Sequence, residues 1–375
     1  MKKITTAGGI LLITTSMVQA LGLDRSGQNI GVIFEDADNY VELSFGSISP
    51  SASGVDVATV ATGNVAQDYT QIGLAFKHQY TDQFSAALII DQPYGADILY
   101  PAASPVLGMT AADLNSMAYS VIGRYELDNG FSLHGGVRAQ TIDANITLGG
   151  GAYGLSPVDT PPGLNGYNVD LGEDTELGYL FGAAYERPDI ALRVALTYFT
   201  AVDHSFDTQE NINPGVTTQT NVTTPQAVNL DFQTGVAADT LVFGSIRWAD
   251  YSQVVVSPIA FKTATGGGSL TDIDSGYSYN IGVGRRFTDA FSGSLSFGYE
   301  ATGDDLVSPL APTNGNYSVA LGGAYAMDNG FEISGGVRYI VLGDASPETG
   351  TPDVARASFT DNSAVAVGLK VAYNF

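Results

Sequence analysis

Apolar and polar residues alternate one by one along most of the chain, and helical periodicity is scarce. In the stretch FSGSLSFGY, residues 291–299, Phe291, Leu295 and Phe297 share one face, and serine and glycine fill the other. The final run, residues 365–375, repeats the pattern. One face is apolar and the other is small or polar with few charges, which is typical of a strand between lipid and a wet lumen.

This alternation predicts fourteen strands, at residues 39–48, 69–80, 84–94, 117–127, 131–143, 173–186, 190–204, 225–236, 240–250, 276–287, 291–301, 316–326, 331–343 and 361–375. Six tight turns alternate strictly with seven longer connections such as 95–116, 144–172 and 344–360. Short periplasmic turns and long external loops are the pattern of an up-and-down membrane barrel. The predicted fold class is therefore all-β, a transmembrane antiparallel β-barrel with both ends on the periplasmic side.

Two turns lie in nearly repeated stretches, YELDNGFSLHGGVRA at 125–139 and YAMDNGFEISGGVRY at 325–339. Asn-Gly is expected to supply the positive φ angles of tight hairpins. Phe131 and Phe331 fit the aromatic girdle at the membrane interface. By strand parity Val137 faces lipid, whereas Arg138 and Arg338 face the lumen.

The chain divides into three predicted parts. Residues 1–20, with two lysines, a short apolar stretch and Ala20, are expected to be a secretory signal. Residues 21–38 are expected to form a short plug, and residues 39–375 the barrel. No later stretch approaches the roughly 18 consecutive apolar residues of a spanning helix.

Composition narrows the possible partners. The net charge is −24, which argues against nucleic acid, because phosphate binding needs a basic surface. The chain has no cysteine, so disulfides and thiolate metal sites are excluded. Nothing in the sequence suggests a cofactor. We expect a monomer in the outer membrane of a Gram-negative cell, in contact with lipid and lipopolysaccharide.

Two stretches resemble the FadL/TodX family of long-chain fatty acid and hydrocarbon transporters, which are fourteen-stranded outer-membrane barrels. They are DQPYGADILYP with the following AADLNSMAYSVIGRYELDNGFSLHGGVRAQTIDANITL, and PQAVNLDFQTGVAADTLVFGSIRWADYS with its Trp248. The resemblance implies an N-terminal hatch inside the barrel. Here the family's Asn-Pro-Ala motif is replaced by the sequence EDAD at residues 35–38, and the hatch segment is short.

Candidate substrate-binding residues fall into two groups. The connection at 95–116 carries apolar side chains in a region expected to face water, which indicates either a ligand groove or a loop packed as a barrel cap. The lumen cations either hold a carboxylate or form cross-strand pairs with inward acids, and the cost of isolated charges favours pairing. The predicted substrate-binding set is Ile98, Leu99, Tyr100, Val106, Leu107, Met109, Arg124, Arg138 and Arg338.

A gate is predicted near the third strand. Proline cannot donate to a ladder, so Pro93 indicates a break, a bulge, an opening or simply a strand end. The resemblance implies a third strand that bends inward and opens a lateral exit to the membrane. We expect Phe34, Pro93 and Gly95 to take part in gating.

The predicted function is passive outer-membrane transport of hydrophobic compounds, long-chain fatty acids or hydrocarbons, with capture at the loops and lateral release through the wall. The alternative is a water-filled porin for small polar solutes, or a structural or adhesive barrel. Catalysis is not expected, because the three histidines lie on different strands with no local serine or aspartate signature.

Overall fold

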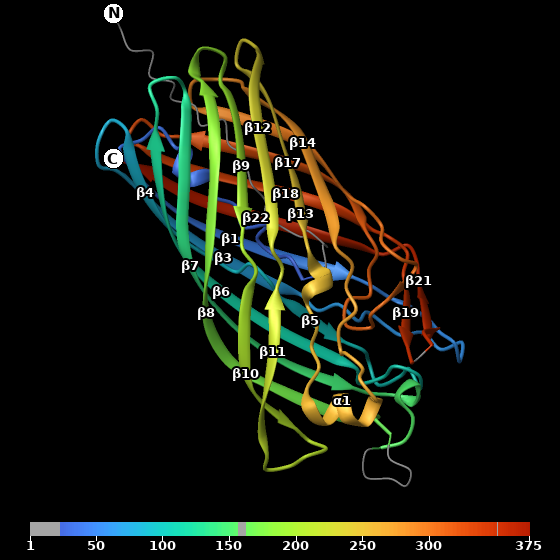
Figure 1. The fold of residues 1–375 in the computed structure, drawn as a ribbon. Coiled ribbons are helices and arrows are strands. Elements are labelled where there is room, and N and C mark those ends of the chain that lie inside the picture. Colours follow the sequence, from blue (N-terminus) through green and yellow to red (C-terminus); the bar gives the residue numbers. More distant parts are fainter. Residues whose placement is uncertain (1–22, 157–162, 351) are drawn as a thin grey trace, which may run out of the picture.

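A computed structural model describes residues 23–156, 163–350 and 352–375, and the predicted signal at 1–20 lies outside these residues. The described chain forms one closed antiparallel barrel (Figure 1). Its sheet has 17 strand segments, which make fourteen spanning strands because three of these are each interrupted once. The predicted fold class and strand number are thus confirmed.

The spanning strands follow the predicted order around the barrel. They are β1 (Asn39–Ser51), β3 (Tyr69–Gln79), β4 (Phe84–Asp91) with β5 (Ala96–Leu99), β6 (Ala111–Glu126), β7 (Phe131–Leu148), β8 (Tyr167–Arg187), β9 (Leu192–Phe199) with β10 (Val202–Glu210), β11 (Thr217–Thr224) with β12 (Ala227–Ala237), β13 (Thr240–Ala249), β14 (Gly276–Arg286), β15 (Phe291–Glu300), β17 (Asn316–Ala326), β18 (Phe331–Leu342) and β22 (Ser363–Asn374). The barrel closes where β1 pairs with β22, from Tyr40 opposite Asn374 to Ser51 opposite Ser363.

Smaller elements lie in the connections and at the N-terminus. The short strands are β2 (Gly54–Asp56), β16 (Leu306–Val307), β19 (Ser346–Thr349), β20 (Val354–Ala355) and β21 (Ala357–Phe359). The helices are η1 (Gly31–Phe34), η2 (Gly151–Tyr153), η3 (Pro188–Ile190), η4 (Tyr251–Gln253) and α1 (Ile259–Thr265). Among the described residues, no helix is both long enough and apolar enough to cross a membrane.

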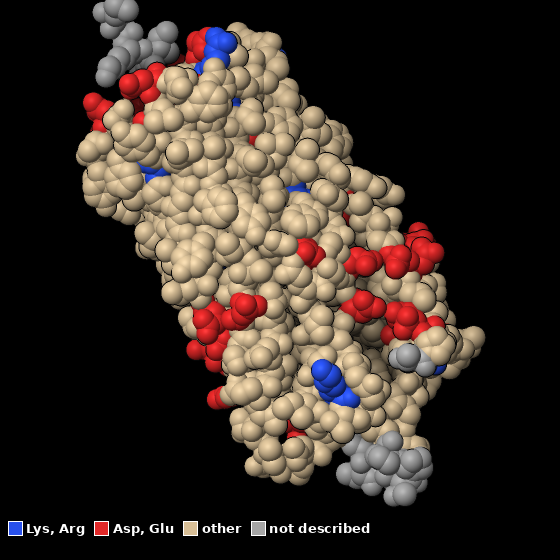
Figure 2. Space-filling model, viewed as in Figure 1, with Lys and Arg blue, Asp and Glu red and all other residues tan. Residues whose placement is uncertain are grey.

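The in-and-out parity of the strands agrees with the prediction. Leu133 and Val137 on β7 are 56% and 44% exposed on the outer face, whereas Arg138 beside them is buried. On β18, Val337 is exposed and Arg338 is buried in the same way. In the space-filling view a band across the upper part of the barrel is almost free of charge, with acidic side chains above it at the upper end and others below it in the lower half (Figure 2). This distribution fits a lipid-facing band.

The twin hairpins correct one detail of the prediction. Gly130 and Gly330 have positive φ angles of 83° and 89°, but neither Asn129 nor Asn329 does. Instead, the Asn129 side-chain oxygen accepts a hydrogen bond from the backbone N–H of Phe131 at 3.2 Å. A three-residue hairpin loop needs only one left-handed residue, at its last position, so glycine supplies it and asparagine caps the turn.

The strands on one side of the barrel run further than predicted. The expected loops at 95–116 and 144–172 contain β5, the first part of β6, the last part of β7 and the first part of β8. In these extensions the outward positions are polar, as at Asn115, Asn145 and Asp170, while the inward positions are apolar. The alternation therefore reverses relative to the lipid band, which is expected where a strand leaves the bilayer for water.

The N-terminal segment, residues 23–38, contacts inward-facing side chains of several strands. The Asn229 side chain on β12 donates to the carbonyl of Gly27 at 2.9 Å. Lys77 on β3 donates to the carbonyls of Glu35 and Ala37 at 2.7 and 3.0 Å. Phe34 is buried within the barrel. Because these contacts come from different walls, the segment lies inside the lumen.

Candidate functional site

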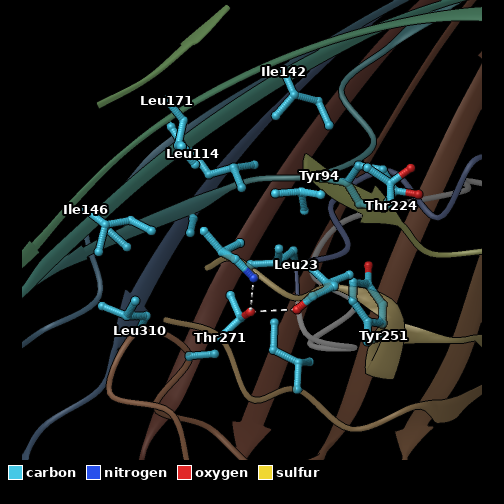
Figure 3. Close-up of a pocket in the computed structure, with 18 of the residues that line it drawn as sticks. Leu23, Tyr94, Leu114, Ile142, Ile146, Leu171, Thr224, Tyr251, Thr271 and Leu310 are labelled. Atoms are coloured by element: carbon cyan, nitrogen blue, oxygen red, sulfur yellow. Dashed lines mark hydrogen bonds between the residues drawn. The ribbon is translucent and has the colours of Figure 1, made fainter. Parts of the chain in front are cut away.

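An apolar cavity lies within the extended part of the barrel, between the walls formed by β6, β7, β8, β10 and β11 and the loops at the same end (Figure 3). Its volume is about 820 Å³, including the part open to solvent. Leu114, Ile142, Ile146, Leu171 and Phe206 supply most of the wall. A predominantly apolar lining of this kind is typical of small-molecule sites.

Three residues form the floor of the cavity, namely Leu23 from the N-terminal segment, Tyr94 from the third spanning strand and Tyr251 from η4. The rings of Tyr94 and Tyr251 pack edge to face, with centroids 6.4 Å apart. Both tyrosines are almost fully buried. The floor therefore joins the N-terminal segment to the strand that carries Pro93.

Two arginines lie beneath this floor, and both have partners. Arg247 on β13 donates to both carboxylate oxygens of Asp24, at 2.6 and 2.9 Å, in a fully buried pair. When the Gln28 amide is oriented by its hydrogen-bonding partners, its oxygen lies 2.7 and 3.1 Å from the two terminal nitrogens of Arg138, while Arg138 Nε has no hydrogen-bond partner among the described residues. Both contacts tie the N-terminal segment to the barrel wall.

The roof segment, residues 252–275, covers one side of the cavity and includes α1. Its Val254, Val256, Thr271 and Ile273 line the cavity. The Thr271 hydroxyl donates a hydrogen bond to the carbonyl of Val254 at 2.6 Å and accepts one from the backbone N–H of Val256 at 3.1 Å (Figure 3). These bonds connect the beginning of the segment to its end. The segment thus holds its own shape.

Two carboxylates anchor the roof segment. Glu210, at the end of β10, is buried and accepts hydrogen bonds from the backbone N–H groups of Ala260 and Phe261 at 2.8 and 2.7 Å. Asp250 accepts bonds from the hydroxyls of Ser252 and Ser275, both at 2.7 Å, at the two ends of the segment. These hydrogen bonds lower the pKa of Asp250 below its usual range, so this anchor stays ionised at neutral pH.

The third spanning strand is interrupted at Pro93, as the proline suggested. β3 pairs with β4 only as far as Leu74 opposite Ile90, and β4 ends at Asp91. Beyond this point the Gln92 side-chain oxygen accepts from the N–H of Ile72 at 2.9 Å. Ile72 is 54% exposed on the outer face, so the interruption lies beside the lipid band.

The N-terminal segment lies across this interruption. The Arg25 N–H donates to the carbonyl of Pro93 at 2.8 Å, and Gly95 donates to that of Leu23 at 2.9 Å. The Arg25 guanidinium lies 2.7 Å from the Asp97 carboxylate and 3.4 Å from the ring centre of Tyr69 on β3. Arg25 therefore joins both sides of the interrupted ladder.

The predicted loop residues come together, but away from the cavity. Tyr100 and Leu107 are fully buried in a separate cluster with Phe359, and Val106 packs against it. Ile98 packs against both this cluster and the core cluster that contains the cavity wall. Two others, Leu99 and Met109, are exposed. Of the two readings, this packing favours the barrel cap. None of the six lines the cavity, and their role in substrate binding stays a prediction.

The lumen arginines do not line the cavity either. Arg124 forms ion pairs with Glu186 and, at 3.2 Å, with Glu126, which agrees with the expectation of pairing. Its guanidinium also lies 4.7 Å from the ring centre of Phe34. Arg338 is buried on β18.

The cavity residues themselves were missed. Most of them fall in segments predicted to be loops, and Tyr94 and Ile142 lie at the ends of predicted strands. One signal was present in the sequence. The run ITLGG after Asn145, and the alternation of alanine, leucine and aspartate at 111–114, continue a period of two beyond the predicted strand ends. These residues can be recognised as continuations of the strands only if one knows that, beyond the bilayer, the apolar side chains of a strand face the lumen and the polar ones face water.

A closed fourteen-stranded antiparallel barrel with an apolar outer band, an occupied lumen and an apolar cavity defines a transport barrel of the Gram-negative outer membrane. The comparison with family models agrees. The chain belongs to the outer membrane protein transport protein family (OMPP1/FadL/TodX), whose model matches residues 23–375. The family consists of transport proteins, which agrees with the expectation that the chain is not an enzyme.

Solved structures show the same fold. A FadL homologue of Pseudomonas aeruginosa has a TM-score of 0.69 at 13% identity, with 95% of each chain covered. The toluene transporter TodX of Pseudomonas putida gives 0.66 at 13% identity, with 92% of each chain covered. The toluene transporter TbuX of Ralstonia pickettii gives 0.64 at 13% identity, covering 93% of this chain and 92% of that one. No curated protein sequence matches the chain.

Proposed function

We propose that this protein carries hydrophobic molecules passively across the outer membrane. The observation that supports this most is the apolar cavity, whose walls offer buried hydrocarbon surface to a molecule arriving from the loop end. Transfer of apolar surface out of water supplies the driving force. No energy source is needed for movement down a concentration gradient.

The path that we propose continues from the cavity floor to the interruption of the third strand. Leu23 and Tyr94 belong to the floor, and the same two segments meet again at Pro93 and Gly95. The N-terminal segment acts as the plug. When it moves away from Pro93, the cavity gains an outlet beside Ile72, toward the lipid.

The test is uptake by Gram-negative cells that lack their own transporter of this family. We expect cells making the full chain to accumulate a labelled hydrocarbon faster than cells with an empty vector. A disulfide that fixes the plug to the third strand should stop this uptake. Because the chain has no cysteine of its own, Asp24→Cys with Tyr94→Cys gives a single reversible link across an antiparallel bridge. Both forms of this variant lack the Asp24–Arg247 ion pair, so uptake is compared between its oxidised and its reduced form, and reduction should restore uptake.

A water-filled porin is the competing function, and planar bilayers distinguish the two. The plug contacts β3, β7, β12 and β13, so we expect low single-channel conductance from the full chain. High conductance in the full chain, together with uptake that is insensitive to the disulfide, would reject the transport path proposed here.

A further inference from the structure

We infer that the cavity selects neutral hydrophobic molecules and rejects carboxylates, so that a hydrocarbon is carried and an ionised fatty acid is not. This inference rests on the proposed function and makes its substrate class specific. It is carried by the charges of the cavity lining, of the groups beneath the floor and of the loops around the roof.

The lining offers nothing that would bind an anion strongly. Among the described residues that line it, none is lysine, arginine or histidine. Asp113 is the acidic residue among them, and its carboxylate accepts from Asn115 on the outer face of β6 at 2.9 Å. The Thr271 hydroxyl is already bonded to the backbone of the roof segment.

The arginines beneath the floor are already bound to the protein. Arg247 is held by both oxygens of Asp24. The two terminal nitrogens of Arg138 are held by the amide oxygen of Gln28, once that amide faces them, and its Nε has no hydrogen-bond partner among the described residues. A substrate carboxylate would have to displace a buried partner that belongs to the same chain. Displacing Asp24 would leave a carboxylate buried and unpaired, so the exchange at Arg247 gains little. Displacing Gln28 would leave a buried amide without its partner, which also costs free energy.

The loops around the roof carry charges of the same sign as a carboxylate. Asp272 and Asp274 flank the lining residue Ile273, and Asp304 and Asp305 precede the lining residue Ser308. Burial, and after it the neighbouring carboxylates of Asp353 and Asp272, raise the pKa of Glu348 in the same group of loops. Such a field lowers the local concentration of anions.

A carboxylate that enters the cavity therefore loses its hydration without gaining a cation, whereas a hydrocarbon loses no hydrogen bond. The cost of burying an unpaired charge well exceeds the 1.4 kcal/mol that corresponds to tenfold in affinity. We expect discrimination of at least about tenfold between a hydrocarbon and a carboxylate of equal chain length.

The experiment compares uptake of labelled dodecane and labelled dodecanoate at neutral pH, in cells lacking other members of the family. The inference predicts that the full chain speeds dodecane uptake over the empty vector and leaves dodecanoate uptake near the vector level. Equal stimulation of both, or faster dodecanoate uptake, overturns the inference while leaving the proposed function intact. Stimulation of neither rejects the proposed function itself.

A matched pair of variants on β6 tests the cause. Leu114→Arg places a cation in the cavity wall, and Asn115→Arg places the same cation on the outer face, one residue along. We expect the first to raise the ratio of dodecanoate to dodecane uptake by about tenfold, and the second to leave it unchanged. If the two variants show the same ratio, the inference is wrong.

A buried arginine can also prevent folding, so the folded state of each variant is checked by its heat-dependent migration in gels. Ala311→Lys, on a loop that lines the cavity, then provides a second site for the cation. It should shift selectivity in the same direction as Leu114→Arg. A folded Ala311→Lys protein with the original selectivity would also overturn the inference.

Discussion

The buried ion pair between Asp24 and Arg247 is expected to hold the plug in place, and Asp24→Asn tests this directly. Asparagine keeps the size of the side chain but removes its charge. Arg247 lies on β13 within the closed barrel and cannot follow the plug, so it is left buried with its charge uncompensated. The substitution therefore weakens the contact between the plug and the barrel wall.

The magnitude follows from the burial of the pair. The two side chains are 0% and 3% exposed, so solvent does not screen their interaction. Removing one partner of such a pair costs about 3–5 kcal/mol. If the plug detaches to relieve this cost, the population of the detached state rises roughly 10²- to several 10³-fold.

Trypsin cleavage after Arg25 reports detachment, because this residue is buried beside Pro93 in the closed state. We expect folded Asp24→Asn protein in detergent to be cut at Arg25 much faster than the unchanged chain, with increased single-channel conductance. The double variant Asp24→Asn with Arg247→Met should regain protection, since no unpaired charge remains.

Asp189→Asn is the matched control. Asp189 also pairs with an arginine, Arg187, but the two side chains are 61% and 50% exposed, and solvent screens an exposed pair so that it contributes little to stability. This variant should be cut like the unchanged chain. The reasoning is refuted if Asp24→Asn protein, with its barrel folded, is as resistant at Arg25 as the control.

Three further changes test other contacts. In Gly95→Ala the new Cβ would lie 2.6 Å from Arg25 Nε, so Arg25 must move and trypsin should cut there faster, whereas unchanged protection would contradict the close packing. Glu210→Ala leaves the first N–H groups of α1 without acceptors, at about 1–3 kcal/mol, and should make the roof segment more sensitive to proteases in the folded barrel. Val137→Arg should lower the stability in lipid by about 2–4 kcal/mol, as measured by urea unfolding, while Asn145→Arg on the same strand should have little effect; equal costs would refute the assigned edge of the lipid band.

The sequence determined the barrel. Strands with alternating apolar and polar residues can span lipid only as a closed barrel, because there every backbone group is paired and the apolar face points outward. The alternation of short and long connections then set the order of the strands, and parity correctly turned Val137 outward and Arg138 inward. Pro93 likewise marked the interruption of the third strand, because a proline cannot donate to its neighbour.

Only the tertiary structure decided where a molecule can bind. Apolar and polar residues alternate in the same way in a strand within the bilayer and in a strand beyond it. Within the bilayer the apolar side chains face outward to lipid, and beyond it they face inward, so Leu114 and Ile142 could not be assigned to a cavity. The partners of the buried charges were equally hidden. Asp24 and Arg247 are separated by 223 positions, and only closure of the barrel around the N-terminal segment brings them into contact.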